Sequence, residues 1–238
     1  MFDALFTTTT EYKKLSHALS GKGACALFGL PASGRAQVYA ALCRQLDKPL
    51  CIVTPGEAEA TRFAADLNTL GIPAAVFPAR DYVLRPIEGT AREYEYRRLA
   101  VLGELVGGRL RAVAVPAEAL TQFTTPKEDF CANTRTLHAG DTLLRDDLLA
   151  ALFGAGYTRR AQVDGPGQFS VRGDIVDIFA PDQKMPVRME FWGDEIDTLH
   201  TFDLTTQRRE DAIDKFYLSP AREVLFGKPA DAAEQLRA

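Results

Sequence analysis

Short apolar runs alternate with helical patterns over the first 120 residues, and this alternation limits the possible fold more than any other feature. The apolar runs are continuous, which is typical of strands that are covered on both faces. The stretches between them repeat apolar residues at spacings of three and four, as amphipathic helices do. Strands that alternate with helices predict a parallel sheet with crossover helices. We expect the strands at residues 24–28, 50–54, 74–77 and 112–115, and the helices at residues 34–46, 57–70 and 92–105.

The pattern changes after Pro116, where strand signals separated by turn residues replace the helical spacing. Gly193-Asp194 is placed to form a tight hairpin turn, and Gly173 to form a bulge. The expected elements are a helix at residues 145–153 and strands at residues 169–179, 187–192, 196–202 and 216–218.

These patterns predict an α/β fold: a degenerate RecA-like, P-loop-like parallel sheet that carries an inserted small α+β domain. The first domain would span residues 1–120 and the α+β domain residues 121–211. Residues 212–238 would begin a segment that returns to pack on the first domain.

Composition excludes several classes of protein. Hydrophobic residues make up 46% of the chain and charged residues 25%, as in ordinary globular proteins. The net charge of -4 argues against a large sequence-independent DNA footprint, and residues 121–211 carry ten basic against sixteen acidic side chains. No run is long enough to span a membrane, and no secretory signal opens the chain, so we expect a cytoplasmic location.

Residues 29–36 resemble a phosphate-binding loop that has lost its chemistry. Gly29 and Gly34 have the spacing of a Walker A loop, which needs a Lys for the phosphates and a Ser or Thr hydroxyl for Mg²⁺. Arg35 and Ala36 occupy those two positions, and Pro31 has no N–H to donate. We therefore predict a degenerate loop, with residual nucleotide or anion binding at the helix N-terminus as the alternative.

No catalytic or metal-binding set emerges from the remaining residues. The four cysteines lack zinc-site spacing, and we expect no histidine to converge with the acidic residues between 174 and 195. We predict no catalytic residue, no metal and no cofactor for this chain. The charged run at residues 92–98 predicts a solvated helix face, with contact to nucleic acid through its tyrosines as the alternative.

Two arginines and the only tryptophan are predicted on the polar side of adjacent strands. Strict alternation turns Val187, Met189 and Phe191 inward, which leaves Arg188 and Trp192 outside. The same rule places Arg172 outside. Arginine and tryptophan are the residues most enriched at the energetic centres of protein interfaces. The alternative is that loops of the same domain cap the tryptophan, while the arginines form surface ion pairs with nearby carboxylates such as Asp174, Glu190 or Asp194.

Three segments resemble the UvrB-homology module found at the N-terminus of bacterial transcription-repair coupling factors. They are QFSVRGDIVDIF at residues 168–179, PVRMEFWGDEI at residues 186–196 and LSPARE at residues 218–223. UvrB shares related patterns, but it has an intact Walker A loop and a long Tyr-rich hairpin after the strand that corresponds to residues 74–77. Here Arg35 and Ala36 depart from that loop, and only residues 78–90 precede the next helix, so the coupling factors are the better match.

The resemblance implies a non-catalytic module that recruits the excision-repair protein UvrA to RNA polymerase stalled at DNA damage. It also implies that Arg172, Arg188 and Trp192 contact UvrA, with Trp where the family usually has Phe. ATP-dependent translocation on DNA, and contact with RNA polymerase, would belong to regions of the parent protein outside this chain. The alternative is a UvrB-like P-loop NTPase that verifies damage on DNA.

Overall fold

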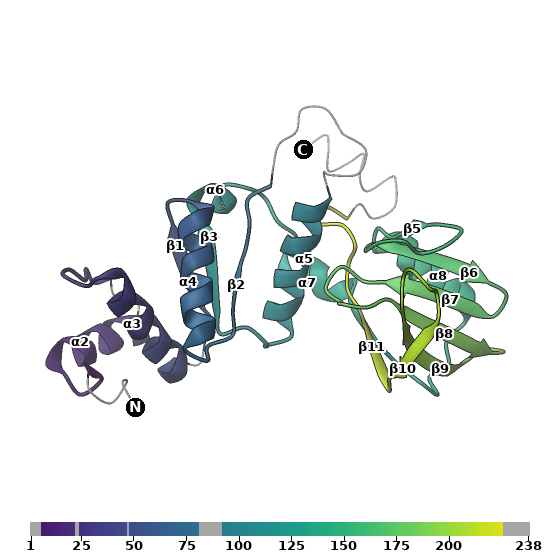
Figure 1. Cartoon of the computed structure of the whole chain (residues 1–238), viewed down its shortest axis with the longest axis horizontal. Coiled ribbons are helices and arrows are strands. Elements are labelled where there is room, and N and C mark those ends of the chain that lie inside the picture. The colour runs from purple at the N-terminus through teal and green to yellow at the C-terminus, as the bar shows by residue number, and fades with distance from the viewer. Residues whose placement is uncertain (1–5, 22–23, 47, 81–91, 226–238) are drawn as a thin grey trace. The chain divides into compact units, whose positions relative to one another are not determined.

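The computed structural model describes residues 6–21, 24–46, 48–80 and 92–225 (Figure 1). These residues form two compact units. The first comprises residues 1–79 and 107–122, and the second comprises residues 80–106 and 123–238. Residues 78–90 are too few to form a UvrB-like hairpin according to the sequence, and they lie largely outside the described residues, as do residues 226–238.

The first unit is built on a three-stranded parallel sheet. Strand β3 (Ala112–Pro116) lies between β1 (Leu50–Thr54) and β2 (Ala74–Val76). All five residues of β3 are buried, in agreement with its uninterrupted apolar sequence. The predictions for these three strands and for their parallel direction are confirmed.

Helices pack on this sheet and extend the first unit. α4 (Glu57–Thr69) packs on the strands and buries Ala60 and Leu67 completely (Figure 1). α3 (Ala32–Gln45) contacts α4 and β1, and it shares a small apolar cluster with α2 (Thr10–Ser20). The short α6 (Ala117–Leu120) follows β3 directly.

The strand predicted at residues 24–28 is wrong. These residues have no strand structure and are exposed, and Phe28 is 89% exposed. A strand forms where a neighbour accepts its backbone hydrogen bonds, and in the described ranges β1, β2 and β3 pair only with one another. The strand expected before the degenerate loop is therefore absent from these described residues. The structure supports a mixed α/β fold for the chain.

The second unit centres on a six-stranded sheet. Its spatial order is β10 (Arg209–Ala212), β9 (Glu195–Phe202), β8 (Val187–Trp192), β7 (Ile175–Phe179), β6 (Gln168–Arg172) and β5 (Thr158–Arg159). The β5–β6 pairing is parallel, and the other described pairings of this sheet are antiparallel. A separate antiparallel pair joins β4 (Arg135–His138) to β11 (Lys215–Leu218). The described residues of this unit include the helices α5 (Glu93–Val106), α7 (Lys127–Ala132) and α8 (Arg145–Gly154).

Two Gly-Asp turns set the register of the central strands. Gly193 connects β8 to β9 at φ 64°, which confirms the predicted hairpin turn. Gly173 connects β6 to β7 in the same way, at φ 60°, so residues 168–179 form a hairpin instead of one bulged strand. Glycine at the first position of a two-residue turn allows a positive φ, which matches the twist of the strands. The side chains of β6, β7 and β8 alternate between the two faces of the sheet, whereas the β8–β9 register shifts between the pairs Glu190–Thr198 and Phe191–Ile196.

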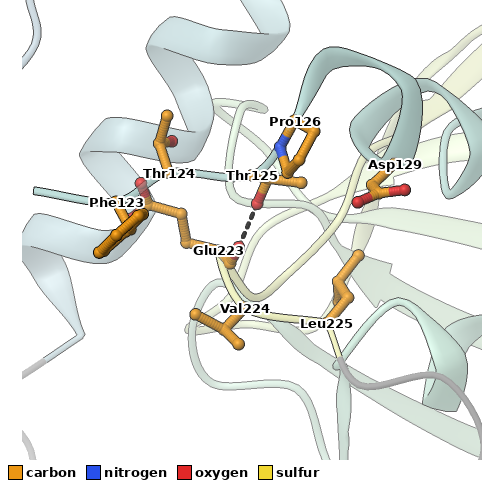
Figure 2. A pocket seen from close by; sticks show the side chains of 8 residues that line it. All are labelled: Phe123, Thr124, Thr125, Pro126, Asp129, Glu223, Val224 and Leu225. Carbon is orange, nitrogen blue, oxygen red and sulfur yellow. Dashed lines mark hydrogen bonds between the residues drawn. The ribbon is translucent and has the colours of Figure 1, made fainter. Parts of the chain in front are cut away.

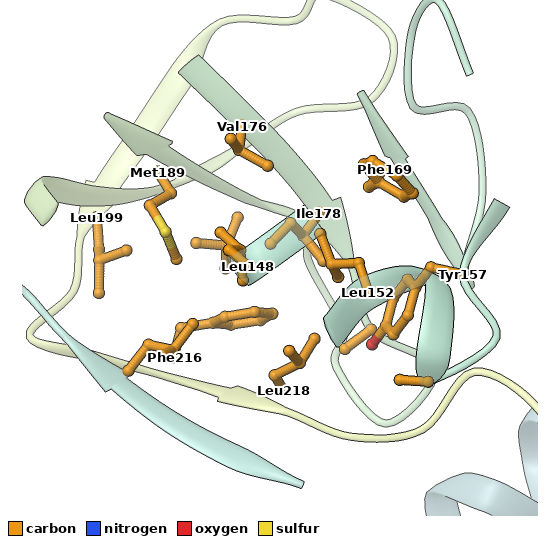
Figure 3. Packing of buried hydrophobic residues seen from close by; sticks show 14 of the residues in the cluster. Leu148, Leu152, Tyr157, Phe169, Val176, Ile178, Met189, Leu199, Phe216 and Leu218 are labelled. Atoms are coloured by element: carbon orange, nitrogen blue, oxygen red, sulfur yellow. The ribbon is translucent and has the colours of Figure 1, made fainter. Parts of the chain in front are cut away.

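One face of the six-stranded sheet forms the core of this unit. Phe169, Val176, Ile178 and Met189 are fully buried on that face. Figure 3 shows side chains from α8 and β11 pointing toward the residues of the sheet. The helix predicted at residues 145–153 and the strand predicted at residues 216–218 are confirmed as α8 and β11. The alternation of buried residues along β8 is also as predicted.

The two units divide the chain differently from the predicted domains. α5 groups with the second unit, although the sequence placed it in the first domain. Residues 212–225, the described part of the predicted returning segment, also belong to the second unit. There Phe216 and Leu218 enter its core. None of the helices in the described residues has the length and apolarity needed to cross a membrane.

Candidate functional site

The outer face of the six-stranded sheet carries the three residues singled out from the sequence. Cross-strand pairing aligns Ser170 with Asp177, Asp177 with Arg188, and Arg188 with His200. Arg172 lies two residues beyond Ser170 on β6, and Trp192 lies four residues beyond Arg188 on β8, so alternation keeps both on this face. The structure therefore places Arg172, Arg188 and Trp192 on one side of one sheet.

Asp177 holds both arginines. Arg188 donates from Nε to Asp177 Oδ1 at 2.7 Å and from Nη2 to Oδ2 at 3.0 Å, and Arg172 Nη2 donates to Oδ2 at 2.6 Å. The Asp177 side chain is fully buried. A carboxylate removed from water requires such charged donors, because an unpaired buried charge is strongly destabilising. Asp177 thus fixes the orientation of two guanidinium groups at once.

Arg188 lies on the outer face but is covered. Only 10% of its side chain is exposed, its Nη1 donates to the Gln207 carbonyl at 3.1 Å, and its guanidinium lies 4.7 Å from the centre of the Phe202 ring. Phe202 belongs to a small apolar cluster with Val163 and Phe179 on this end of the face. The prediction that Arg188 stands in water is wrong, because the chain folds back over it.

The loop at residues 203–208 provides that cover. Asp203 Oδ1 accepts hydrogen bonds from the backbone N–H groups of Thr206 at 2.7 Å and Thr205 at 3.1 Å. The hydrogen bonds from Thr206, chiefly from its backbone, lower the pKa of Asp203. Gln207, at φ 59°, donates its side-chain amide to the Leu204 carbonyl at 2.8 Å. The loop that covers Arg188 is therefore locally ordered.

Arg172 and Trp192 remain accessible. Trp192 is 83% exposed and the Arg172 side chain is 47% exposed. The alternative in which loops of the same domain cap the tryptophan is wrong. The expected ion pairs of the arginines are also replaced: Asp174 pairs with Arg145, and Glu190 with Arg209. The exposed part of the face thus includes the Trp192 indole and the Arg172 guanidinium, which a buried carboxylate holds.

The residues of the degenerate loop lie in the first unit. Gly29 has φ 80°, but Gly34, Arg35 and Ala36 belong to the beginning of α3. The Arg35 guanidinium lies 5.7 Å from the centre of the Phe63 ring on α4, and its Nη1 lies 3.9 Å from the Glu59 carboxylate. Glu59 and Phe63 thus offer this cation partners within the protein.

Among the residues with described placement, no three His, Cys, Asp or Glu side chains gather as metal ligands would.

Sequence analysis missed a buried ion pair between α5 and the end of the second unit. Arg98 and Glu223 are both fully buried, and Arg98 Nη2 donates to Glu223 Oε1 at 2.8 Å while Arg80 Nη2 lies 2.7 Å from Oε2. Burial alone would raise the pKa of Glu223, but hydrogen bonds from Arg98, Thr124 and Arg80 outweigh it and lower that pKa. The prediction of a solvated face over residues 92–98 is therefore wrong at Arg98. In the sequence, the one feature that singles out either partner of this ion pair is the LSPARE segment, which contains Glu223.

A pocket lined in part by Glu223 lies next to this ion pair (Figure 2). Thr125 Oγ1 donates to the Glu223 carbonyl across it, as the dashed line shows. The pocket is lined by Phe123, Thr124, Thr125, Pro126, Asp129, Glu223, Val224 and Leu225.

Comparison with known proteins finds a family match within the second unit. Residues 136–224 match the family described as the UvrB interaction domain. This range includes all of β6 to β9, and so the whole face described above.

Whole-chain similarities extend further. The chain is 37% identical over 219 residues to the transcription-repair-coupling factor of Mycobacterium tuberculosis and 28% identical over 212 residues to that of Bacillus subtilis, covering 87% and 88% of this chain. It is also 28% identical over 226 residues to UvrABC system protein B of Chlorobium limicola, covering 89% of this chain. The chain spans 18% of the length of those two coupling factors and 32% of that of the UvrB protein.

The resemblance predicted from the three motifs is thereby confirmed: this chain contains a UvrB interaction domain and is homologous to part of the transcription-repair coupling factors over most of its length.

Proposed function

We propose that this chain is a non-catalytic module of a transcription-repair coupling factor that recruits UvrA and so links RNA polymerase stalled at damage to nucleotide excision repair. The observation that supports this most is the exposed pair of Trp192 and Arg172 on one face of the UvrB interaction domain. Translocation on DNA and contact with RNA polymerase are assigned to parts of the parent protein outside this chain.

The three residues of the face have different roles in this proposal. Trp192 is the apolar anchor, since a large exposed aromatic gains most from being desolvated by a partner. Arg172 is the polar contact, because nearly half of its side chain is open to solvent. Arg188 acts as a positioning residue: it holds Asp177, and Asp177 holds Arg172.

The absence of ATP turnover is proposed for this module on chemical grounds. Ala36 has no side-chain hydroxyl for Mg²⁺ at the position where a Walker A loop has one. Arg35 has carboxylate and aromatic partners on α4, and its planar fork does not replace a compact lysine ammonium in a tight loop.

A second candidate function is that of a UvrB-like NTPase that verifies damage on DNA. The similarity to UvrABC system protein B favours it. Two measurements with Mg-ATP distinguish these functions. The recruiting module should give no heat of binding in isothermal titration and no release of phosphate. Micromolar binding with turnover would support the NTPase instead.

Binding of purified UvrA tests the recruiting function directly. Titration of UvrA with the whole chain should give saturable binding, and Arg172→Ala or Trp192→Ala should each weaken it by at least about 30-fold, as expected for an interface hot spot of about 2 kcal/mol. Phe123→Ala is a matched control for the tryptophan, since Phe123 is 92% exposed outside this face. Arg62→Ala is the control for Arg172, because Arg62 is a half-exposed, ion-paired arginine of the first unit. Unchanged affinity in both Arg172→Ala and Trp192→Ala would reject the proposed face.

A further inference from the structure

A second arginine–carboxylate pair lies on the same outer face. Arg209 of β10 donates to Glu190 of β8, and Thr198 of β9 donates to the other Glu190 oxygen at 3.2 Å. The Glu190 side chain is 19% exposed and the Arg209 side chain 45% exposed. The carboxylate is therefore the covered member of the pair and the guanidinium the accessible one.

This arrangement repeats the one around Asp177. In both pairs a carboxylate rooted on a central strand holds an arginine through Nη2, and about half of each arginine side chain remains in water. A guanidinium has five N–H donors, so Arg172 and Arg209 each keep donors for another acceptor. The carboxylates orient the cations without covering them.

The two carboxylates that hold these arginines, Asp177 and Glu190, lie near each other and near Trp192 on the sheet. Asp177 pairs with Arg188 across β7 and β8, and Glu190 lies two residues farther along β8. Strand spacing of about 4.8 Å and a rise of about 3.4 Å per residue put the Cα atoms of Asp177 and Glu190 about 8 Å apart. Trp192 lies two residues beyond Glu190, about 7 Å farther on. All three groups therefore fit within a single protein contact.

The charge of these groups selects the chemistry of the partner. Two oriented guanidinium groups match two carboxylates in both charge and geometry. Residues 121–211 as a whole are acidic, with sixteen acidic against ten basic side chains. A net negative domain is unsuited to a polyanion such as DNA, whereas a local cationic pair suits an acidic protein segment.

We propose that Arg209, held by Glu190, is a further partner-contacting residue, and that the bound partner surface presents two carboxylates around an apolar site for Trp192. This inference rests on the proposed function, since it extends the same face by one cation.

Affinity for UvrA, measured over a range of salt concentrations, tests the proposal. Arg209→Ala should weaken binding by roughly 10- to 100-fold, as expected for loss of a charged hydrogen bond, and should lower the salt dependence. Arg209→Glu should weaken binding further, and Arg209→Lys should recover part of the loss. Arg208→Ala is the matched control, because Arg208 is the neighbouring exposed arginine and should leave binding unchanged. Circular dichroism and thermal melting of each variant confirm that the fold is retained.

The outcomes separate this inference from the function on which it rests. If Arg172→Ala weakens binding and Arg209→Ala does not, the inference is overturned and the proposed function stands. If the wild-type chain does not bind UvrA at all, both are overturned. An equal loss in Arg208→Ala, or tighter binding in Arg209→Glu, would also refute the assignment. So would binding of a single-stranded oligonucleotide that is lost in Arg209→Ala, since it would make the face a nucleic-acid site.

Discussion

Replacement of Asp177 by asparagine should destabilise the second unit strongly, because one buried carboxylate neutralises two arginines. The substitution removes charge from the contacts at 2.7 Å and 3.0 Å with Arg188 and at 2.6 Å with Arg172. Arg188, with only 10% of its side chain exposed, is then left as an uncompensated charge. Breaking a buried ion pair in this way costs about 3–5 kcal/mol. Arg172 adds little to this figure, since its half-exposed pair is screened by solvent.

Thermal unfolding followed by far-ultraviolet circular dichroism measures the effect. At about 4 °C per kcal/mol, a cost of 3 kcal/mol lowers the Tm of the second unit by about 12 °C. Fluorescence is a poor probe here, because the single tryptophan is 83% exposed in the folded chain. A double variant, Asp177→Leu with Arg188→Met, is the control, since replacing both partners by apolar residues of similar size restores much of the stability. A Tm within 2 °C of wild type for Asp177→Asn would refute the account of this face.

Two further predictions concern the second unit. The pKa of Glu223 is lowered in the folded chain, so its ion pair stabilises the fold above about pH 4.5, and this contribution disappears as the pH falls through the folded-state pKa. The drop in Tm on acidification from pH 6 to pH 3 should therefore be smaller in Glu223→Gln than in the wild-type chain. An identical drop in both would contradict this. Tyr157 is buried and donates a hydrogen bond from its hydroxyl to the Ser219 carbonyl at 2.7 Å, and burial raises its pKa well above the ordinary value. Tyr157→Phe should lower the free energy of unfolding in urea by about 1 kcal/mol. An unchanged free energy of unfolding would mean that water replaces the hydrogen bond.

Local patterns predicted most of the regular structure. The continuous apolar sequence of β3 and the alternation of β8 give both the elements and the faces that they bury. The two Gly-Asp turns follow from the freedom of glycine at positive φ, although only the turn at Gly193 was recognised. A turn inside residues 168–179 and a bulge shift the alternation in the same way, so the sequence does not distinguish them.

Long-range contacts account for what the sequence could not predict. Residues 24–28 have the composition of a strand, but a strand also needs a neighbouring strand for its backbone hydrogen bonds. The sequence of the segment alone does not show whether such a neighbour exists. Arg188 is covered by a loop that begins fifteen residues later, at Asp203. Arg98 meets Glu223 across 125 residues of sequence. Alternation assigned Arg172, Arg188 and Trp192 to one face, whereas their different exposures depend on such distant segments.

The environment of Trp192 in the complex with UvrA tests the central claim most directly. Growth with 5-fluorotryptophan labels the chain at one position, because Trp192 is its only tryptophan, and gives one ¹⁹F resonance. We predict that unlabelled UvrA shifts and broadens this resonance, and that the same concentration of UvrA leaves it unchanged in the Arg172→Ala chain. A resonance that stays at its free position while the wild-type chain is bound to UvrA would contradict the account.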